Sequence, residues 1–217
     1  MPRNLLLKRW FDRFVISAAL VGLSVHPGYS QDDASLPQQC STDCISSYGQ
    51  VLGVSKRGVE AYSNCNSECV IFSPNKWRDT YTGIKWQCVE YARRWLLVNK
   101  GAVYGDVDIA ADIWDKVDHL TDVETQKSLP LQSHLNGSMQ APRVGDLLVY
   151  AKAFNQTGHV AVVTEVDLEA GHLKVAEQNY RNEPWAEDFA RKVTLVKIGD
   201  AYWLLDPYLL GWKHLEP

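Results

Sequence analysis

The chain has 217 residues, with 46% hydrophobic and 22% charged side chains and a formal net charge of -4. This length and composition are ordinary for one globular domain with a sizeable core. They exclude a membrane-spanning helix, because no stretch reaches about 18 consecutive apolar residues, and the acidic balance argues against nucleic acid as a partner.

The first 30 residues have the features of a secretory signal peptide. Four basic side chains precede an apolar run over 14–25, and small residues at positions 28 and 30 fit a cleavage site. An uncleaved inner-membrane anchor is the alternative, but the apolar run is short for one. We therefore expect a signal peptide over 1–30, a secreted or periplasmic protein, and no stable membrane insertion after cleavage. Losing four basic residues and Asp12 would leave a net charge of about -7.

Residues 31–50 are polar and rich in Ser, Gln and Asp, so we expect an N-terminal arm ahead of a domain over 51–217. The stretch 51–75 contains glycines, asparagines and a proline. It is expected to be rich in loops, with a short extended piece at 59–62. No internal repeat or low-complexity tract interrupts the domain.

Four cysteines form two spaced pairs, Cys40/Cys44 and Cys65/Cys69. Export favours disulfides over a four-cysteine zinc site. Bonds from Cys40 to Cys69 and from Cys44 to Cys65 would pin the arm to the domain. The sequence leaves the other two pairings open.

Two helices are expected next. Residues 85–99 carry apolar side chains at helical spacing and are followed by a basic turn and Gly101. Residues 108–120 show a second apolar face, with Asp106 or Asp108 as the cap. These aspartates are interpreted as caps, because too few oxygen ligands surround them for a calcium site.

The second half of the chain changes to the period of β-strands. The expected strands are 145–151, 158–166, 172–180, 192–198, 202–205 and 209–213. Helices followed by antiparallel strands predict an α+β domain.

Cys88 is the cysteine left over when the other four pair. It lies near the start of the helix expected over 85–99, where unpaired N–H groups and the helix dipole favour a thiolate. A free cysteine is more often a small buried core residue, but that does not explain why an exported protein keeps an unpaired thiol. We interpret Cys88 as a nucleophile whose own backbone N–H helps to bind an oxyanion.

His159 is the best candidate for the partner base, at the start of the apolar strand 158–166. A short turn leads into 172–180, and hairpin pairing then sets His159 opposite about position 177. Glu177 and Asn179 share that face because strand side chains alternate. Glu177 is favoured to orient the imidazole, since a carboxylate also stabilises an imidazolium. The plainer alternative is a set of ordinary structural residues at a strand end.

These residues lie in segments that resemble the CHAP (cysteine, histidine-dependent amidohydrolase/peptidase) family, in particular the amidase domain of glutathionylspermidine synthetase/amidase. The resemblance runs from about residue 53 to about residue 212 and rests most on three segments: Trp86-Gln87-Cys88-Val89-Glu90-Tyr91-Ala92-Arg93-Arg94, Gly158-His159-Val160-Ala161-Val162 and Ala176-Glu177-Gln178-Asn179. It implies a papain-like fold, with N-terminal helices packed on an antiparallel sheet. It also implies a cysteine amidase or peptidase in which Cys88 forms a thioester, His159 is the base and then the acid, and Glu177 orients His159.

The same resemblance makes Arg93 and Asn179 candidate substrate-binding residues, and Tyr62 a candidate oxyanion or substrate contact. Arg93 is otherwise a structural ion-pair former, and Tyr62 a packing residue. No metal or organic cofactor is implied, because a thiol, an imidazole and a carboxylate suffice.

The chain departs from the amidases it resembles in three ways: the signal peptide, the paired cysteines, and a length that leaves no room for their ATP-dependent synthetase domain. These departures concern the substrate, which we expect to be a glutathionyl-polyamine-like conjugate or, alternatively, a peptidoglycan peptide. A catalytically inactive binding module on the same fold is a third hypothesis. The complete set of Cys88, His159 and Glu177 disfavours it.

Overall fold

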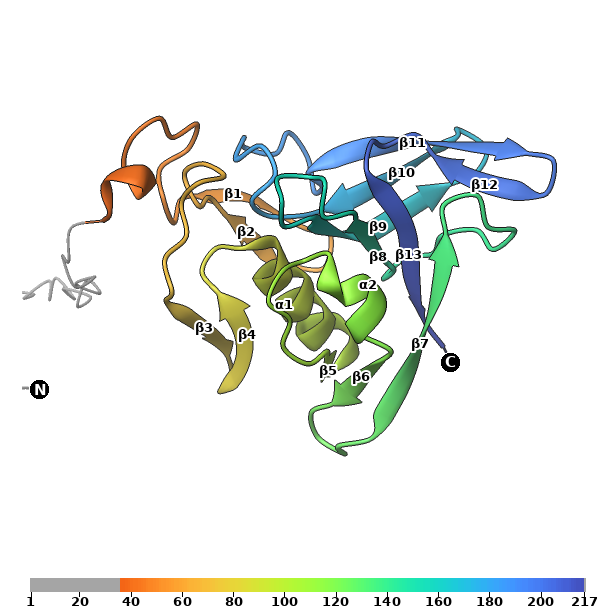
Figure 1. The fold of residues 1–217 in the computed structure, drawn as a ribbon, viewed down its shortest axis with the longest axis horizontal. Helices are drawn as coiled ribbons and strands as arrows, with labels where there is room; N and C mark the ends of the chain where they lie inside the picture. Colours follow the sequence, from red (N-terminus) through yellow and green to blue (C-terminus); the bar gives the residue numbers. More distant parts are fainter. Residues whose placement is uncertain (1–35, 217) are drawn as a thin grey trace, which may run out of the picture. The chain divides into compact units, whose positions relative to one another are not determined.

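The computed structural model describes residues 36–216, and the expected signal peptide over 1–30 lies outside them. The first half of this range (Figure 1) contains η1 (Gln38–Cys40), β1 (Val51–Val54), β2 (Glu60–Tyr62), β3 (Pro74–Trp77), β4 (Thr80–Ile84), α1 (Cys88–Lys100), β5 (Ala102–Val103) and α2 (Asp112–Lys116). The second half contains β6 (His119–Asp122), β7 (Ser128–Leu135), β8 (Leu147–Tyr150), β9 (His159–Asp167), β10 (His172–Ala176), β11 (Arg191–Ile198), β12 (Ala201–Leu204) and β13 (Leu209–Leu215). Across the described range, no helix has the length and apolar character needed to cross a membrane.

A nine-stranded sheet forms the centre of the described part of the chain, in the order β12-β11-β10-β9-β8-β13-β7-β6-β5. All its neighbouring strands are antiparallel. β13 inserts between β8 and β7, so strands from the end of the chain complete the middle of the sheet. The hairpins β1–β2 and β3–β4 pair separately. The predicted α+β class with an antiparallel sheet is therefore confirmed.

The central strands are buried on both faces, which explains their nearly continuous apolar sequence. In β8, Leu147 and Val149 belong to one apolar cluster, while Leu148 and Tyr150 belong to the other. This division follows the two-residue alternation of a strand. The first cluster also contains Trp95 and its neighbours from α1, so burial of the helix fixes it against the sheet.

Helix α1 confirms the first predicted helix, but it begins at Cys88 because Gln87 is extended, with φ -88° and ψ 158°. At its other end, Gly101 adopts the left-handed conformation that glycine favours, and its N–H donates to the Leu97 carbonyl. Gln87 is the N-cap residue, yet its side chain does not cap the first turn. Cys88 is therefore the first residue of a helix whose leading N–H groups have no side-chain cap from Gln87.

The second predicted helix is wrong over most of its length. α2 covers only Asp112–Lys116, and β6 begins shortly after it. Val117 is already extended, with φ -108° and ψ 104°, and Leu120 pairs with Leu129 of β7. Both residues are buried, so pairing with a distant strand outweighs the helical spacing of the apolar residues. Strands β6 and β7 were not predicted.

Both cysteine pairs are disulfide-bonded, Cys40 with Cys69 and Cys44 with Cys65. This is the pairing expected from the sequence, and both bonds tie residues 36–50 to the domain. Those residues belong to the same compact unit as the sheet. Cys88 is the free cysteine of the described range, and it is buried.

Gly158, which precedes His159, tests how tightly the start of β9 is packed. Its φ is +73°, and a Cβ added there would lie 2.6 Å from the Tyr150 carbonyl oxygen and 2.8 Å from the Ala111 amide nitrogen. Gly101 has a similar φ of +67° but nothing within 4 Å of an added Cβ.

We expect Gly101→Ala to cost about 1–2 kcal/mol of unfolding free energy from backbone strain. Gly158→Ala should cost about 1–3 kcal/mol more from the clash, which urea unfolding of both variants measures. Equal losses in the two variants would contradict the close approach.

Candidate active site

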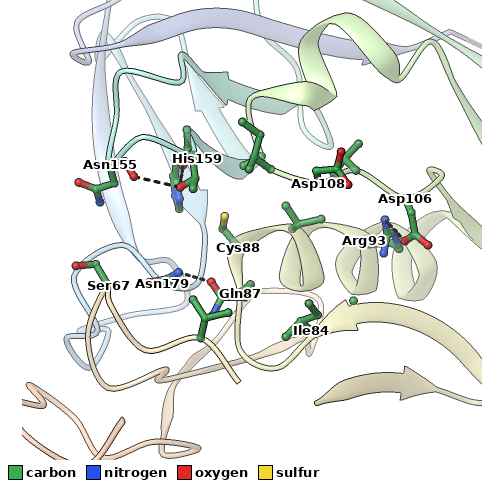
Figure 2. Close-up of a pocket in the computed structure, with 18 of the residues that line it drawn as sticks. Ser67, Ile84, Gln87, Cys88, Arg93, Asp106, Asp108, Asn155, His159 and Asn179 are labelled. Carbon is green, nitrogen blue, oxygen red and sulfur yellow. Dashed lines mark hydrogen bonds and ion pairs between the residues drawn. The ribbon is translucent and has the colours of Figure 1, made fainter. Parts of the chain in front are cut away.

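Cys88, His159 and Asn179 line one cleft of about 310 Å³ (Figure 2). The start of α1 and β4 form one side of it, and the segment leading into β9 forms another. Part of the wall comes from the disulfide-bonded region, through Ser67 and Val70. Segments far apart in the sequence therefore meet around the thiol.

The thiol of Cys88 stands at the N-terminal end of α1, and Figure 2 shows its sulfur directed into the cleft on the side of His159. The residue is 8% exposed, so a small opening reaches the sulfur while most of the side chain is covered. The positive end of the helix dipole and the uncapped N–H groups favour negative charge at this point. This setting suits a thiolate and an adjacent oxyanion.

His159 is the first residue of β9 and is 1% exposed. Its Nε2 lies 2.9 Å from Glu177 Oε2, so this nitrogen donates to the carboxylate and Nδ1 is left for the side of Cys88. Three aromatic rings surround the imidazole at 5.3–5.7 Å between ring centroids, those of Tyr150, Phe154 and Tyr180. The rings shield the His159–Glu177 hydrogen bond from water and so strengthen it.

The charges of this group depend on one another. Burial disfavours an imidazolium, but the Cys88 thiolate and the Glu177 carboxylate outweigh burial and raise the pKa of His159 to about 9. Burial also opposes ionisation of Glu177, yet Arg191 and His159 together hold the pKa of its carboxyl below the ordinary value. The arrangement therefore favours an imidazolium at His159, with the Glu177 carboxylate on one side and the Cys88 sulfur on the other.

Arg191 is a residue of this site that the sequence analysis missed. Its Nε donates to Glu177 Oε1 at 2.6 Å, and its other nitrogens reach Asp206 Oδ2 at 2.6 Å and the Tyr150 hydroxyl at 2.8 Å. Arg191 begins β11 and pairs with Val175, two residues before Glu177. Only the pairing of β10 with β11, which joins segments separated by a long loop, brings the two together.

Gln178 is a second missed residue, although it lies between two predicted ones. Its Nε2 donates to the Gln87 carbonyl at 3.2 Å and to Glu90 Oε2 at 3.2 Å, and its Oε1 accepts from the Tyr62 N–H at 2.8 Å. The side chain is buried. It therefore fastens the segment containing Glu177 to the residue that precedes Cys88.

Two of the three residues expected to bind substrate lie at the cleft. Asn179 lines it and donates to Gln87 Oε1 at 2.7 Å (Figure 2). Arg93 also lines it, but its guanidinium donates to the backbone carbonyls of Thr82, Tyr104 and Gly105. Most of the hydrogen-bonding capacity of Arg93 is thus used to hold the protein's own backbone.

Tyr62 is not among the residues that line the cleft. Its ring stacks on Trp86 with 4.2 Å between centroids, and its hydroxyl donates to the Glu60 carboxylate. The structure therefore does not bring Tyr62 together with Cys88 and His159 in the cleft. Within residues 36–216, no three His, Cys, Asp or Glu side chains gather as metal ligands.

A thiol at a helix start, an imidazole on a facing strand and a carboxylate behind the imidazole are the arrangement of papain-like cysteine hydrolases. The chain belongs to the CHAP domain family, whose model matches residues 79–179. The resemblance predicted from the three sequence segments, and the papain-like fold it implies, are therefore confirmed.

Two curated relatives are long multidomain proteins. The chain is 36% identical over 183 residues to the bifunctional glutathionylspermidine synthetase/amidase of Escherichia coli (strain K12). The alignment covers 76% of this chain and 29% of that protein. It is 33% identical over 162 residues to the trypanothione synthetase of Crithidia fasciculata. That alignment covers 73% of this chain and 24% of the synthetase. The chain spans less than a third of the length of these relatives. A solved structure, Ly7917 with the hydrolyzing product of MDP, is similar to this chain with a TM-score of 0.35 and 17% identity over 59% of this chain and 53% of that one.

The charge coupling at His159 is measurable without a substrate. Glu177→Gln removes one anion beside the imidazolium, and Cys88→Ser removes the other, so each should lower the pKa of His159 from about 9. An NMR titration of the His159 ring in the native protein and both variants checks this. The ring signal of His172, on the neighbouring strand β10, is the internal control. An unchanged His159 titration in both variants would contradict the coupling.

Proposed function

We propose that this CHAP protein is an exported cysteine hydrolase that cuts an amide bond through a thioester on Cys88. The observation that carries the proposal is the buried imidazole of His159, hydrogen-bonded at 2.9 Å to an ionised Glu177 and facing the cleft that Cys88 lines. A merely structural histidine would not need a thiol at a helix start on its other side.

The proposed reaction has two halves. The Cys88 thiolate attacks the amide carbonyl carbon, and the negative oxygen is stabilised by N–H groups at the start of α1. As the C–N bond breaks, the His159 imidazolium protonates the leaving amine and the thioester remains. Neutral His159 then takes a proton from water, the hydroxide attacks the thioester, and the Cys88 thiolate leaves. Glu177 holds the imidazole in place throughout and stabilises its charged form.

Two observations support export. The disulfides Cys40–Cys69 and Cys44–Cys65 require an oxidising compartment in most organisms. The sequence of residues 1–30 has the pattern of a signal peptide. We propose that the mature protein acts outside the cytoplasm, in the periplasm or the medium.

We further propose a glutathionyl-polyamine conjugate as the substrate class. The chain is similar over most of its length to a glutathionylspermidine synthetase/amidase. One end of the cleft (Figure 2) carries Asp106, which pairs with Arg93 at 3.1 Å, and Asp108, which is 93% exposed and lies 3.8 Å from Lys116 Nζ. Carboxylates there suit a substrate whose leaving group is a cationic amine.

Cys88→Ala should abolish hydrolysis, because it removes the nucleophile, and it should leave the melting temperature nearly unchanged. His159→Ala should reduce kcat by about 10²–10⁴-fold through loss of the acid and base. Mass spectrometry of products from glutathionylspermidine and from purified peptidoglycan sacculi, incubated separately with native protein and variants, checks both claims. Turnover retained by Cys88→Ala would refute the mechanism. Release of peptides from sacculi, without hydrolysis of glutathionylspermidine, would show that the substrate is a peptidoglycan peptide.

Asp108→Asn tests the cationic leaving group. The loss of one exposed charge should raise KM for glutathionylspermidine about 2- to 5-fold at low salt, and kcat should not change. The matched control is Asp115→Asn, which removes the same charge from the exposed surface of α2 outside the cleft. Steady-state kinetics at low and high salt compare the two. An equal rise in KM for both variants would mean that Asp108 does not bind the cationic amine of the substrate.

A further inference from the structure

One backbone carbonyl of the disulfide-bonded segment is bonded to the residue that directly precedes Cys88. The Cys69 oxygen accepts a hydrogen bond from Gln87 Nε2 at 3.2 Å and another from Asn64 Nδ2 at 3.2 Å. Gln87 is the residue directly before Cys88. The Gln87 side chain therefore connects the Cys69 carbonyl directly to the residue next to the thiol.

Gln87 also bonds to two residues on the other side of the cleft. Its Oε1 accepts from Asn179 Nδ2 at 2.7 Å (Figure 2), and its main-chain carbonyl accepts from Gln178 Nε2 at 3.2 Å. Both partners directly follow Glu177. The Gln87 amide thus lies between the disulfide-bonded segment and the segment that carries the carboxylate behind His159.

The Cys69 carbonyl is held by the Cys40–Cys69 bond together with local hydrogen bonds, since Asn64 Nδ2 donates to it and the Cys69 N–H donates to Asn66 Oδ1. The segment 63–73 contains no helix or strand, so no regular backbone ladder holds it. Its apolar contacts form only a small cluster, in which the half-cystines Cys40, Cys65 and Cys69 are joined by partly buried neighbours. A crosslink is the usual means of fixing a segment with so small a core.

We propose that the Cys40–Cys69 disulfide is a positioning element of the active site. It fixes the Cys69 carbonyl, which orients the Gln87 amide. The Gln87 amide in turn keeps Asn179 docked at the start of α1. The Cys44–Cys65 disulfide holds the same arm, but neither of its backbone carbonyls bonds to the cleft residues described here. The two crosslinks therefore have separable effects, and only one of them acts on the reactivity of Cys88.

The first test compares matched double variants, Cys40→Ser with Cys69→Ser against Cys44→Ser with Cys65→Ser. The readout is the rate at which iodoacetamide alkylates Cys88, followed by mass spectrometry, and it needs no substrate. We expect a loss of about 10-fold in the first variant, because the groups around the thiol lose their alignment, and less than about 2-fold in the second. Equal rates in the two variants would overturn the proposal.

The second test is a double-mutant cycle with Gln87→Ala. With both disulfides intact, Gln87→Ala should reproduce the loss in alkylation rate, and removing Cys40–Cys69 as well should add nothing. The Gln87→Ala variant with both disulfides intact also tests the proposal if the disulfide variant does not fold. Full reactivity of Cys88 in this variant would refute the connection through Gln87. Additive losses would show that the crosslink acts by another route.

This inference rests on the proposed nucleophile but not on the proposed substrate. If native protein hydrolyses glutathionylspermidine while the alkylation rates do not depend on Cys40–Cys69, the positioning role fails and the proposed function stands. If alkylation follows the predicted pattern without hydrolysis of that substrate, the positioning role stands and the substrate class fails.

Discussion

The hydrogen bond between His159 and Glu177 is the interaction on which the rest of the site depends. Both side chains are almost fully buried, and an isolated buried carboxylate would be strongly destabilising. Arg191 offsets this cost from one side at 2.6 Å and the imidazole from the other at 2.9 Å. Because Asp206 and Tyr150 bind the same guanidinium, the charge is distributed over a network. The carboxylate can therefore stay ionised in an environment that keeps water out.

That network explains why the site requires four neighbouring strands of the sheet. His159 comes from β9, Arg191 from β11, Tyr150 from β8, and Glu177 follows β10. These four strands are consecutive neighbours in the sheet. The helix contributes only the thiol and the N–H groups at its start. Gln178 then joins the two parts, since it bonds both to the Gln87 carbonyl and to the buried Glu90 of α1.

Local patterns were sufficient to predict α1, the strands from β8 onward and the three residues at the centre of the candidate site. Cys88 stands out by cysteine count, and His159 and Glu177 follow from alternation along a hairpin. The expected register was approximate: the ladder pairs Val162 with Ala176 and contains a bulge, but a shift of two residues preserves the face. Arg191, strand β7 and the placement of Tyr62 outside the cleft could not be predicted, because each depends on contacts between segments far apart in the chain.

The free thiol and the two crosslinks also constrain how the chain acquires its covalent structure. Cys69 lies nineteen positions before Cys88 in the sequence, and their segments meet through Gln87 in the native state. A thiolate attacks any accessible disulfide sulfur, so Cys88 competes with Cys40 for Cys69 while oxidation proceeds. Burial of Cys88 at the helix start and complete burial of the Cys69 sulfur end this competition once the sheet has formed. The same packing that places the Cys88 thiol at the start of the helix thereby protects the disulfides from exchange with it.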